Sequence, residues 1–361
     1  MPVARRPRLP RPRLPSLGLP VPQLRRTLAE LLTHVEQGFD DRVAGAMRQR
    51  RGWEIAVVPY VGSGTTSRAH LRGRVVLRRA NRRSKPTLFR SLGRYLTVEV
   101  RGEAAAVEVA DQRVEAISGR EGYLEADVDV DLPPGWHDVS WSAGDTQTPG
   151  RLLVVDPRAT LGVVSDIDDT VIHTGITRMY EAIRNTLLVA TEDRLAIPGA
   201  ADLYQQLVAG DGGRAPVFYV STGAWNLHAP MEQFLDSHGF PAGPLLMTDW
   251  GPGVGWLFRE GSVEFKSRMV LELMAEHPHL RWVLVGDSGQ HDPEAYTAVV
   301  RARPDRVAAI YIREVLPESV TRATHVRGLA DEVARHGVPM LLIRDSADAV
   351  AHAHSLGLIG D

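Results

Sequence analysis

The segment Val163-Val164-Ser165-Asp166-Ile167-Asp168-Asp169-Thr170 determines how the C-terminal half of the chain is interpreted. An apolar run from Leu161 leads into it, and three carboxylates then follow within four positions. Because a buried parallel strand is apolar on both faces, acidic residues are expected only where the strand leaves the sheet. In open α/β sheets that carboxyl end is where ligands bind. The segment therefore predicts a strand that ends at a polar site.

Two of these carboxylates have the spacing of metal ligands. Asp166 and Asp168 are two positions apart, close enough to face one cation. A bound metal ion is the simplest way to keep neighbouring carboxylates ionised together. The alternative is a strand-to-helix turn in which Asp168 or Asp169 caps the following helix. The segment alone does not decide between a metal site and a turn.

The composition excludes several classes of protein. A chain of 361 residues can hold two domains, and its net charge of −2 gives no strong field that would point to nucleic acid. The absence of cysteine excludes disulfides, thiolate metal sites and cysteine nucleophiles. No apolar run approaches the roughly 20 residues of a membrane span, and prolines interrupt the basic N-terminus where a signal peptide needs an apolar segment. We expect a cytoplasmic protein, and the sequence indicates no oligomeric state.

The first 157 residues contain no catalytic cluster. Residues 1–22 hold five arginines and no acidic residue, and predict a disordered tail rich in Pro and Arg. This tail either attracts anionic lipid or is an unselected extension. Residues 23–52 carry apolar side chains at helical spacing and predict an amphipathic helix.

Residues 53–157 predict a small β-sandwich-like domain with a binding or structural role. Short β-rich runs alternate with Gly, Pro and charged turns, and the acidic residues of the run 122–130 recur at every second position. Strands are expected over 55–60, 73–77, 95–100, 107–109, 122–130, 135–141 and 151–155.

Residues 158–361 predict an α/β domain with a doubly wound, mainly parallel sheet, because apolar strands alternate with helical patterns. Strands are expected near 161–166, 216–221, 244–248, 281–286, 306–312 and 338–343. Helices are expected near 177–191, 199–210, 225–238, 264–276, 292–302, 325–337 and 345–355.

Two further segments carry polar groups that bear on the site, namely hydroxyls at a strand end and a lone lysine. The apolar run from Val217 ends in Ser221-Thr222-Gly223, where the hydroxyls and nearby backbone N–H groups can bind a phosphate oxygen. A Ser at a strand end is more often only a helix cap. Lys266 stands at the start of a predicted helix, although a lone lysine is more often a solvated surface charge.

The remaining polar strand end is Gly286-Asp287-Ser288-Gly289-Gln290-His291-Asp292, which follows the apolar run Trp282–Val285. Its two carboxylates, Asp287 and Asp292, stand where the strand ends and the next predicted helix begins. Asp292 can serve as the N-cap of that helix.

Taken in order, these four segments resemble the motifs of the haloacid dehalogenase (HAD) superfamily of phosphotransferases. The run from Ser165 to Gly175 and the run Asp292-Pro293-Glu294-Ala295-Tyr296 are similar to a narrower group. That group is the Mg²⁺-dependent phosphatidate phosphatase family named for a yeast actin patch protein, with its bacterial relatives. Gly223-Ala224 departs from the residues that are commoner in the family at that point. The resemblance implies a HAD-like Rossmannoid core with little or no cap.

The resemblance also implies a role for each candidate residue. Asp166 would be the nucleophile that forms an aspartyl-phosphate, and Asp168 the general acid and base. Lys266 would act in catalysis and, with Ser221 and Thr222, bind the phosphate, while Thr170 would hydrogen-bond locally to hold the turn. Mg²⁺ would bind Asp166, the backbone carbonyl of Asp168 and Asp287 directly. Asp292 is a further candidate, which would either contact the metal through a water molecule or serve only as the N-cap of the next helix.

The substrate is the least determined part of this interpretation. The spacing between the motifs leaves room for little or no cap, which suits a phosphate on a large substrate. Aromatic residues in the loop 248–258 would either touch a membrane interface or pack on the core. The resemblance implies hydrolysis of phosphatidate to diacylglycerol at a membrane surface. The alternatives are a phosphatase of soluble phosphomonoesters and a non-catalytic lipid- or phosphate-binding protein.

Overall fold

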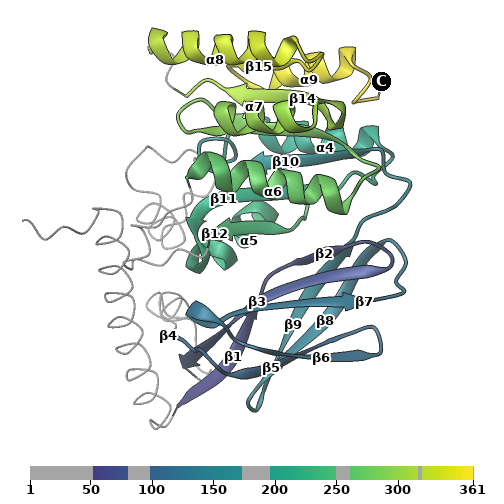
Figure 1. Cartoon of the computed structure of the whole chain (residues 1–361), viewed down its shortest axis with the longest axis vertical. Coiled ribbons are helices and arrows are strands. Elements are labelled where there is room, and N and C mark those ends of the chain that lie inside the picture. The colour runs from purple at the N-terminus through teal and green to yellow at the C-terminus, as the bar shows by residue number, and fades with distance from the viewer. Residues whose placement is uncertain (1–51, 80–97, 173–195, 249–260, 316–318, 361) are drawn as a thin grey trace, which may run out of the picture.

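The structure is a computed structural model that describes residues 52–79, 98–172, 196–248, 261–315 and 319–360 (Figure 1). The tail predicted over 1–22 and nearly all of the helix predicted over 23–52 lie outside these residues. So do the helix predicted over 177–191 and most of the aromatic loop. Among the described residues no helix is both long and apolar enough to cross a membrane.

The N-terminal part is built of β-strands. They are β1 (Trp53–Pro59), β2 (Gly62–Gly64), β3 (Arg68–Arg79), β4 (Val98–Glu99), β5 (Ala104–Val109), β6 (Gln112–Ile117), β7 (Tyr123–Asp129), β8 (Gly135–Ala143) and β9 (Thr146–Val154). In the described part of the chain these strands share one hydrogen-bonded sheet with the order β1-β3-β2-β9-β8-β5-β6. The long strand β3 pairs with β1 and β2 along one edge and with β7 and β4 along the other.

One buried core holds this β domain together. Side chains from β3, β5, β7, β8 and β9 meet in a single cluster around the fully buried Trp141. In β7 the predicted alternation is present: Leu124, Ala126 and Val128 are buried, whereas Glu125 and Asp127 are exposed. Burial of the alternate apolar side chains stabilises such a strand by about 25 cal/mol per Å² of apolar surface.

The C-terminal part contains a parallel sheet. Its strands are β10 (Leu161–Asp166), β11 (Val217–Ala224), β12 (Leu245–Thr248), β13 (Arg281–Asp287), β14 (Val307–Arg313) and β15 (Met340–Ile343). All six predicted strands are present, in the order β12-β11-β10-β13-β14-β15, and every pairing is parallel.

Helices cover both faces of this sheet. One buried cluster joins it to α4 (Ala200–Gly210), α5 (His228–Ser237) and α9 (Ser346–Ser355). A second cluster joins the opposite face to α6 (Ser262–Glu276), α7 (Asp292–Ala302) and α8 (Val320–Ala334). Helix α8 begins five residues earlier than predicted, because the Ser319 hydroxyl accepts a hydrogen bond from the Arg322 N–H (3.4 Å) and caps it.

The strand order locates the ligand-binding edge. From β10 the chain proceeds to β11 and β12 on one side, and from β13 to β14 and β15 on the other. The order therefore reverses between β10 and β13, and ligands of open α/β sheets bind outside the carboxyl ends at such a point. Asp166 and Asp287 are the last residues of these two strands.

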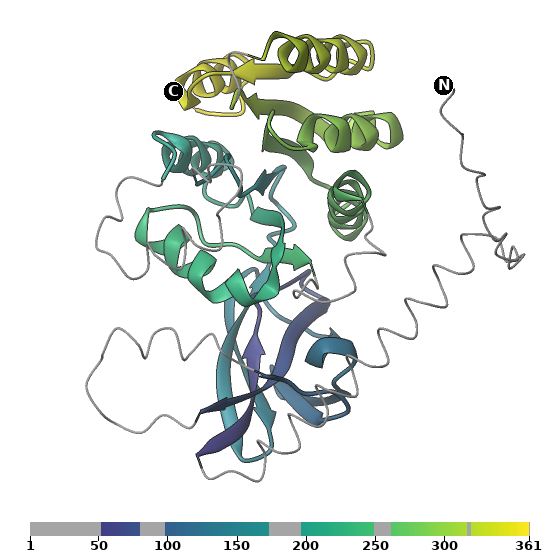
Figure 2. The same ribbon diagram turned by 90° about the vertical axis from the view of Figure 1, so that its left-hand side faces the viewer.

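The β domain lies beyond the β12 edge of the parallel sheet, next to α5 and α6 (Figures 1 and 2). Residues of β3 and β4 contact the parallel-sheet domain: His70 Nε2 is 3.7 Å from Glu276 Oε1, and the Trp225 indole N–H donates to Glu99 Oε1. Trp225 belongs to the short 3₁₀ helix η3 (Trp225–Leu227), which leads into α5.

Candidate active site

Asp166 forms a buried ion pair with Lys266. Asp166 ends β10 and is fully buried, and Lys266 in the second turn of α6 is 1% exposed. The Lys266 Nζ lies 2.7 Å from Asp166 Oδ1. Burial alone would lower the pKa of Lys266, but the Asp166 and Asp292 carboxylates raise it, so the amine stays protonated. The alternative of a solvated surface lysine is therefore wrong.

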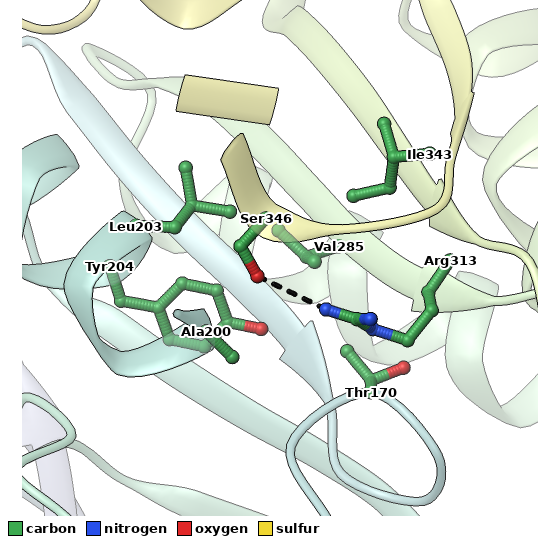
Figure 3. Close-up of a pocket in the computed structure, with 8 residues that line it drawn as sticks. All are labelled: Thr170, Ala200, Leu203, Tyr204, Val285, Arg313, Ile343 and Ser346. Carbon is green, nitrogen blue, oxygen red and sulfur yellow. Dashed lines mark hydrogen bonds between the residues drawn. The ribbon is translucent and has the colours of Figure 1, made fainter. Parts of the chain in front are cut away.

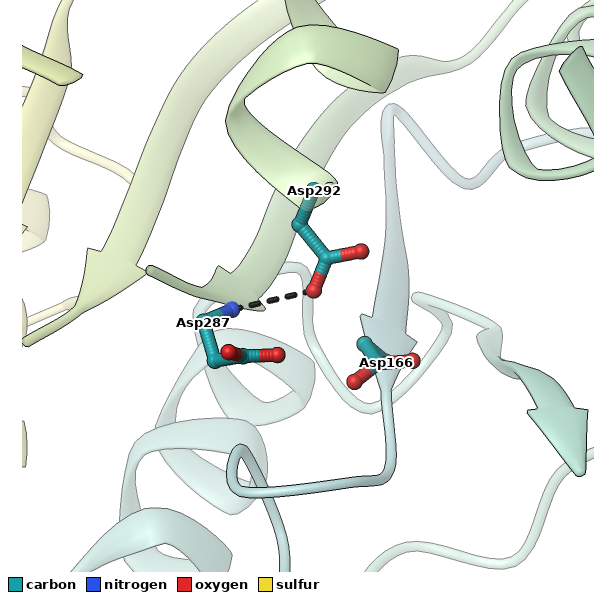
Figure 4. A group of neighbouring side chains, drawn as sticks. All are labelled: Asp166, Asp287 and Asp292. Atoms are coloured by element: carbon teal, nitrogen blue, oxygen red, sulfur yellow. Dashed lines mark hydrogen bonds between the residues drawn. The ribbon is translucent and has the colours of Figure 1, made fainter. Parts of the chain in front are cut away.

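Asp292 lies against the same lysine. Its Oδ1 accepts a hydrogen bond from Lys266 Nζ, and its Oδ2 accepts one from the Asp287 backbone N–H at 3.0 Å (Figure 4). The N-cap position of α7 is occupied by His291, so the capping alternative for Asp292 is wrong. Gly286 makes this approach possible, because a Cβ at that position would lie 2.6 Å from Asp292 Oδ2.

Asp287 is fixed by its own loop. Its Oδ1 accepts hydrogen bonds from the N–H groups of Gly289 (2.6 Å) and Gln290 (2.9 Å). Within the described residues its Oδ2 has no hydrogen-bond partner, and neither has Asp166 Oδ2. A buried polar atom without a partner is costly, so two carboxylate oxygens in this cluster are open to a further ligand.

The donor set of this cluster fits a hard divalent cation. Oxygens of Asp166, Asp287 and Asp292 lie within 4.8 Å of one another, and all three residues are buried (Figure 4). Burial raises the pKa of Asp287 to about 8 and that of Asp166 well above its ordinary range, and Asp292 adds to both shifts. Lys266 supplies a single positive charge against these carboxylates. Oxygen ligands with excess negative charge are what Mg²⁺ and Ca²⁺ prefer.

Asp168 lies on the side of the site that Ser221 borders. The Ser221 hydroxyl donates to Asp168 Oδ2 (3.4 Å) and accepts from the Gly223 N–H (2.9 Å). Burial raises the pKa of Asp168 to about 6, with a further contribution from the Asp169 carboxylate. Asp168 can therefore exchange a proton near neutral pH. Thr222 follows Ser221 at the irregular end of β11 and is half-buried.

The turn after β10 is held by the backbone. The carbonyl of Ile167 accepts hydrogen bonds from Val171 N–H (2.9 Å) and more loosely from Thr170 N–H (3.3 Å), and Asp169 adopts a φ of +54°. The predicted local hydrogen bond of Thr170 is thus made by its backbone. Its hydroxyl lacks a hydrogen-bond partner among the described residues.

Thr170 also lines a small pocket between the β10 turn, α4 and the start of α9 (Figure 3). In this pocket Arg313 donates to the Ser346 hydroxyl at 3.0 Å. The complete lining is Thr170, Ala200, Leu203, Tyr204, Val285, Arg313, Ile343 and Ser346.

Arg322 supports the site but was not predicted. From α8 its Nε donates to the Ser288 carbonyl (2.6 Å) and another of its nitrogens to the Gln290 carbonyl, while Glu294 on α7 accepts from Nη1 (2.5 Å). It thereby holds the loop whose N–H groups bind Asp287. Nothing in the local sequence around Arg322 indicates this role, because the partners are about 30 residues away.

Together the fold and the site define an α/β domain with a buried carboxylate–lysine centre at the carboxyl edge of a parallel sheet. Residues 161–314, somewhat less than half of the chain, match the family described as "Phosphatidate phosphatase APP1, catalytic domain". The family predicted from the motifs is therefore confirmed for these residues.

Two curated fungal proteins are similar over stretches of comparable length. Phosphatidate phosphatase APP1 of Saccharomyces cerevisiae is 30% identical over 153 residues, which are 42% of this chain and 26% of that protein. An uncharacterized protein of Schizosaccharomyces pombe is 26% identical over 161 residues, 45% of this chain and 26% of its own length. The chain thus matches about a quarter of each relative. Among solved structures, a chain of the Pnkp1/Rnl/Hen1 complex shares 15% identity over 48% of this chain and 55% of its own, with a TM-score of 0.30, which supports no inference.

Proposed function

We propose that the domain from residue 158 onward is a HAD-like, Mg²⁺-dependent phosphatase that hydrolyses a phosphomonoester through an aspartyl-phosphate. The observation that carries this proposal is the geometry at the ends of β10, β11 and β13. There Oδ1 of the buried Asp166 lies 2.7 Å from Lys266 Nζ, and an Asp287 carboxylate oxygen lies within 4.8 Å of an Asp166 one. Asp168, two residues after Asp166, accepts a hydrogen bond from the Ser221 hydroxyl. The proposed nucleophile, proton donor and charge-neutralising cation thus belong to one site, which supports the proposal.

In the first step a carboxylate oxygen of Asp166 attacks the phosphorus atom. A bond forms between this oxygen and phosphorus, and the bond from phosphorus to the substrate oxygen breaks. Protonated Asp168 gives its proton to the leaving alcohol. The raised pKa of Asp168, about 6, allows a sizeable protonated fraction near neutral pH.

In the second step ionised Asp168 takes a proton from water, and the water oxygen attacks the phosphorus of the aspartyl-phosphate. The bond from phosphorus to Asp166 breaks, inorganic phosphate leaves, and the Asp166 carboxylate is regenerated. Throughout, Lys266 orients Asp166 and neutralises its charge, and the hydroxyls of Ser221 and Thr222 would hold phosphate oxygens.

Mg²⁺ would be held by Asp166 and Asp287, each of which has a carboxylate oxygen without a hydrogen-bond partner among the described residues. The backbone carbonyl of Asp168 is the third proposed ligand. Asp292 uses both carboxylate oxygens for Lys266 and the Asp287 N–H, so it supports the site. When bound, Mg²⁺ would supply positive charge for the transferring phosphoryl group.

Phosphatidate is the substrate that the similarity favours, since the matched family and the budding-yeast relative both carry that name. Contact with a membrane surface belongs to the same proposal. The aromatic loop and the basic tail, which would make this contact, remain predictions because they lie outside the described residues. So does the expected small size of the cap.

The first test measures phosphate release from phosphatidate in mixed micelles and from a panel of soluble phosphomonoesters, each with and without Mg²⁺. Metal-dependent release that favours phosphatidate supports the whole proposal. Release only from soluble esters keeps the mechanism and removes the lipid. If folded protein releases phosphate from none of them, a non-catalytic binding protein becomes the better interpretation.

Replacing the nucleophile gives a direct prediction. Asp166→Asn should abolish turnover, because an amide cannot form the aspartyl-phosphate, and it should leave the protein folded. Turnover and thermal unfolding are measured on the same preparation. A folded variant with full activity would remove Asp166 from the role of nucleophile.

A further inference from the structure

The β domain contacts the chain just after Ser221 and Thr222, the proposed phosphate-binding residues of β11. Trp225, four residues beyond Ser221, is 7% exposed, and its indole N–H donates to Glu99 Oε1 of β4 at 3.0 Å. The guanidinium of Arg74 on β3 lies 4.5 Å from the centre of the same indole ring. A cation over the face of a desolvated Trp ring is attracted by the negative charge of that face. The indole is therefore held at its edge and on its face by the β domain.

Arg74 is itself fixed in the β domain. It is fully buried, its Nε donates to the Tyr60 hydroxyl (2.8 Å), and its Nη1 donates to the Glu121 carbonyl (2.7 Å). A buried arginine with several directed hydrogen bonds has little freedom to move. The surface that receives Trp225 is therefore rigid.

A second contact lies one helical turn further along. The ring of Tyr60 stacks on His228, with centroids 4.4 Å apart and planes inclined by 24°. His228 is the first residue of α5 and is 2% exposed. The β domain thus contacts both ends of the segment Trp225–His228.

This segment is continuous with the site. The Ser221 hydroxyl donates a hydrogen bond to Asp168 and accepts one from the Gly223 N–H. The pairing of β11 with β12 is irregular between Ser221 and Ala224. The regular pairing with β12 therefore leaves out residues 222 and 223. The indole of Trp225 is held by the β domain only three residues beyond Thr222, so the β domain contacts the chain next to the proposed phosphate-binding hydroxyls.

We propose that the β domain positions the phosphate-binding residues of the active site through a clamp made of Glu99, Arg74 and Tyr60 on Trp225 and His228. This inference rests on the proposed function. The clamp residues contact Trp225 and His228, so we assign them a positioning role and not a catalytic one. The β domain would thereby be required for full turnover even if it binds no ligand of its own.

Glu99 offers the sharpest test, because it is half-buried, whereas Arg74 is fully buried. Glu99→Ala removes the acceptor for the Trp225 N–H, whereas Glu99→Gln keeps a neutral acceptor of the same length. Since a displacement of about 1 Å can cost about 100-fold in rate, the partial loosening in Glu99→Ala should lower kcat about tenfold. KM should change less than kcat, and Glu99→Gln should restore most of the rate.

Glu54→Ala is the matched control. Glu54 is also a half-buried glutamate of the β domain, but it accepts from Arg78 at 2.9 Å within that domain. All three variants and the wild type are assayed with p-nitrophenyl phosphate and phosphatidate, and their thermal unfolding is compared. Equal kcat in Glu99→Ala and Glu54→Ala would overturn the clamp while leaving the proposed function intact.

Hydrogen exchange gives a readout that does not depend on activity. Backbone exchange is followed by mass spectrometry in a peptide that spans 217–231. Glu99→Ala should exchange several-fold faster there than the wild type or Glu54→Ala, because the segment opens more often. Unchanged exchange in this peptide would overturn the clamp even if the wild type proved inactive.

Discussion

Replacing Lys266 with methionine is expected to destabilise the protein by about 3–5 kcal/mol. The side chain is 1% exposed, and its ammonium lies 2.7 Å from Asp166 Oδ1 and also donates to Asp292. Methionine has a similar length and remains flexible, so the change removes the charge with little loss of packing. Removing one partner of a buried ion pair costs about 3–5 kcal/mol, because the other charge stays buried and uncompensated.

The destabilisation should grow as the pH rises. Burial already raises the pKa of Asp166, and loss of the ammonium raises it further. A carboxyl whose pKa is higher in the folded than in the unfolded state binds more protons when folded, so its contribution to stability increases as the pH falls. The difference between wild type and Lys266→Met should therefore be larger at pH 8 than at pH 5.

Urea unfolding followed by circular dichroism, in the presence of EDTA, measures both effects. Arg268→Met is the matched control: it lies on the same helix, but its ion pair with Glu272 (3.0 Å) is exposed and worth at most about 1 kcal/mol. The double variant Asp166→Asn/Lys266→Met should recover part of the lost stability. If Lys266→Met unfolds at the same urea concentration and with the same slope as wild type, the reasoning about a buried pair is refuted.

Two further predictions concern the loop around Asp287, which belongs to the proposed Mg²⁺ site, and the acid sensitivity of the fold. If the proposed function holds, Arg322→Ala should raise about tenfold the Mg²⁺ concentration that gives half of the maximal phosphatase rate, because the loop around Asp287 loses its support. Arg301→Ala is the control. It loses only an exposed ion pair with Glu332, so it should leave this Mg²⁺ concentration unchanged. Burial lowers the pKa of His277 from its ordinary 6.5 to about 3. As the pH falls below 6.5, the His277 side chain therefore gains a proton in the unfolded chain but not in the folded protein, which favours unfolding. Between pH 7 and pH 5, the free energy of unfolding measured with urea should fall by about 2 kcal/mol more in the wild type than in His277→Phe. Equal decreases in the two proteins would contradict this prediction.

The parallel-sheet domain could be predicted well because its signals are local. Each strand is a short apolar run, and the chemical groups stand where the runs end, at Asp166, Ser221 and Asp287. Parallel strands place their carboxyl ends at one edge of the sheet, so the order of the motifs already implies that these side chains converge. The ends of helices were less predictable, as the early start of α8 at its Ser319 cap shows.

The β domain shows what local patterns miss. Strand β6 was not predicted, because half of the residues in the segment Gln112–Ile117 are polar and the segment is largely exposed. The pairing of β3 with strands on both of its edges depends on partners far apart in the sequence. The contacts of Glu99 and Arg74 with Trp225 likewise join distant residues. The role of Asp292 was also missed, because a carboxylate at a helix start is usually a cap and only the folded structure places Lys266 against it.

One signal for Lys266 was present in the sequence. It is one of only two lysines, the other being Lys85, in a chain with 42 basic residues. A chain that uses arginine almost everywhere else has a lysine at the site, where a compact ammonium fits between two carboxylates and the larger planar guanidinium has a different geometry.

Because Lys266 is buried, chemical labelling of its amine can measure how often the site opens to solvent. Amine-reactive reagents need an accessible, unprotonated amine, and here the ammonium is enclosed and kept protonated by its carboxylate partners. Modification at Lys266 must therefore wait for the site to open. With so few lysines to distinguish, the rate at which this position is labelled would measure how often the catalytic centre opens to solvent.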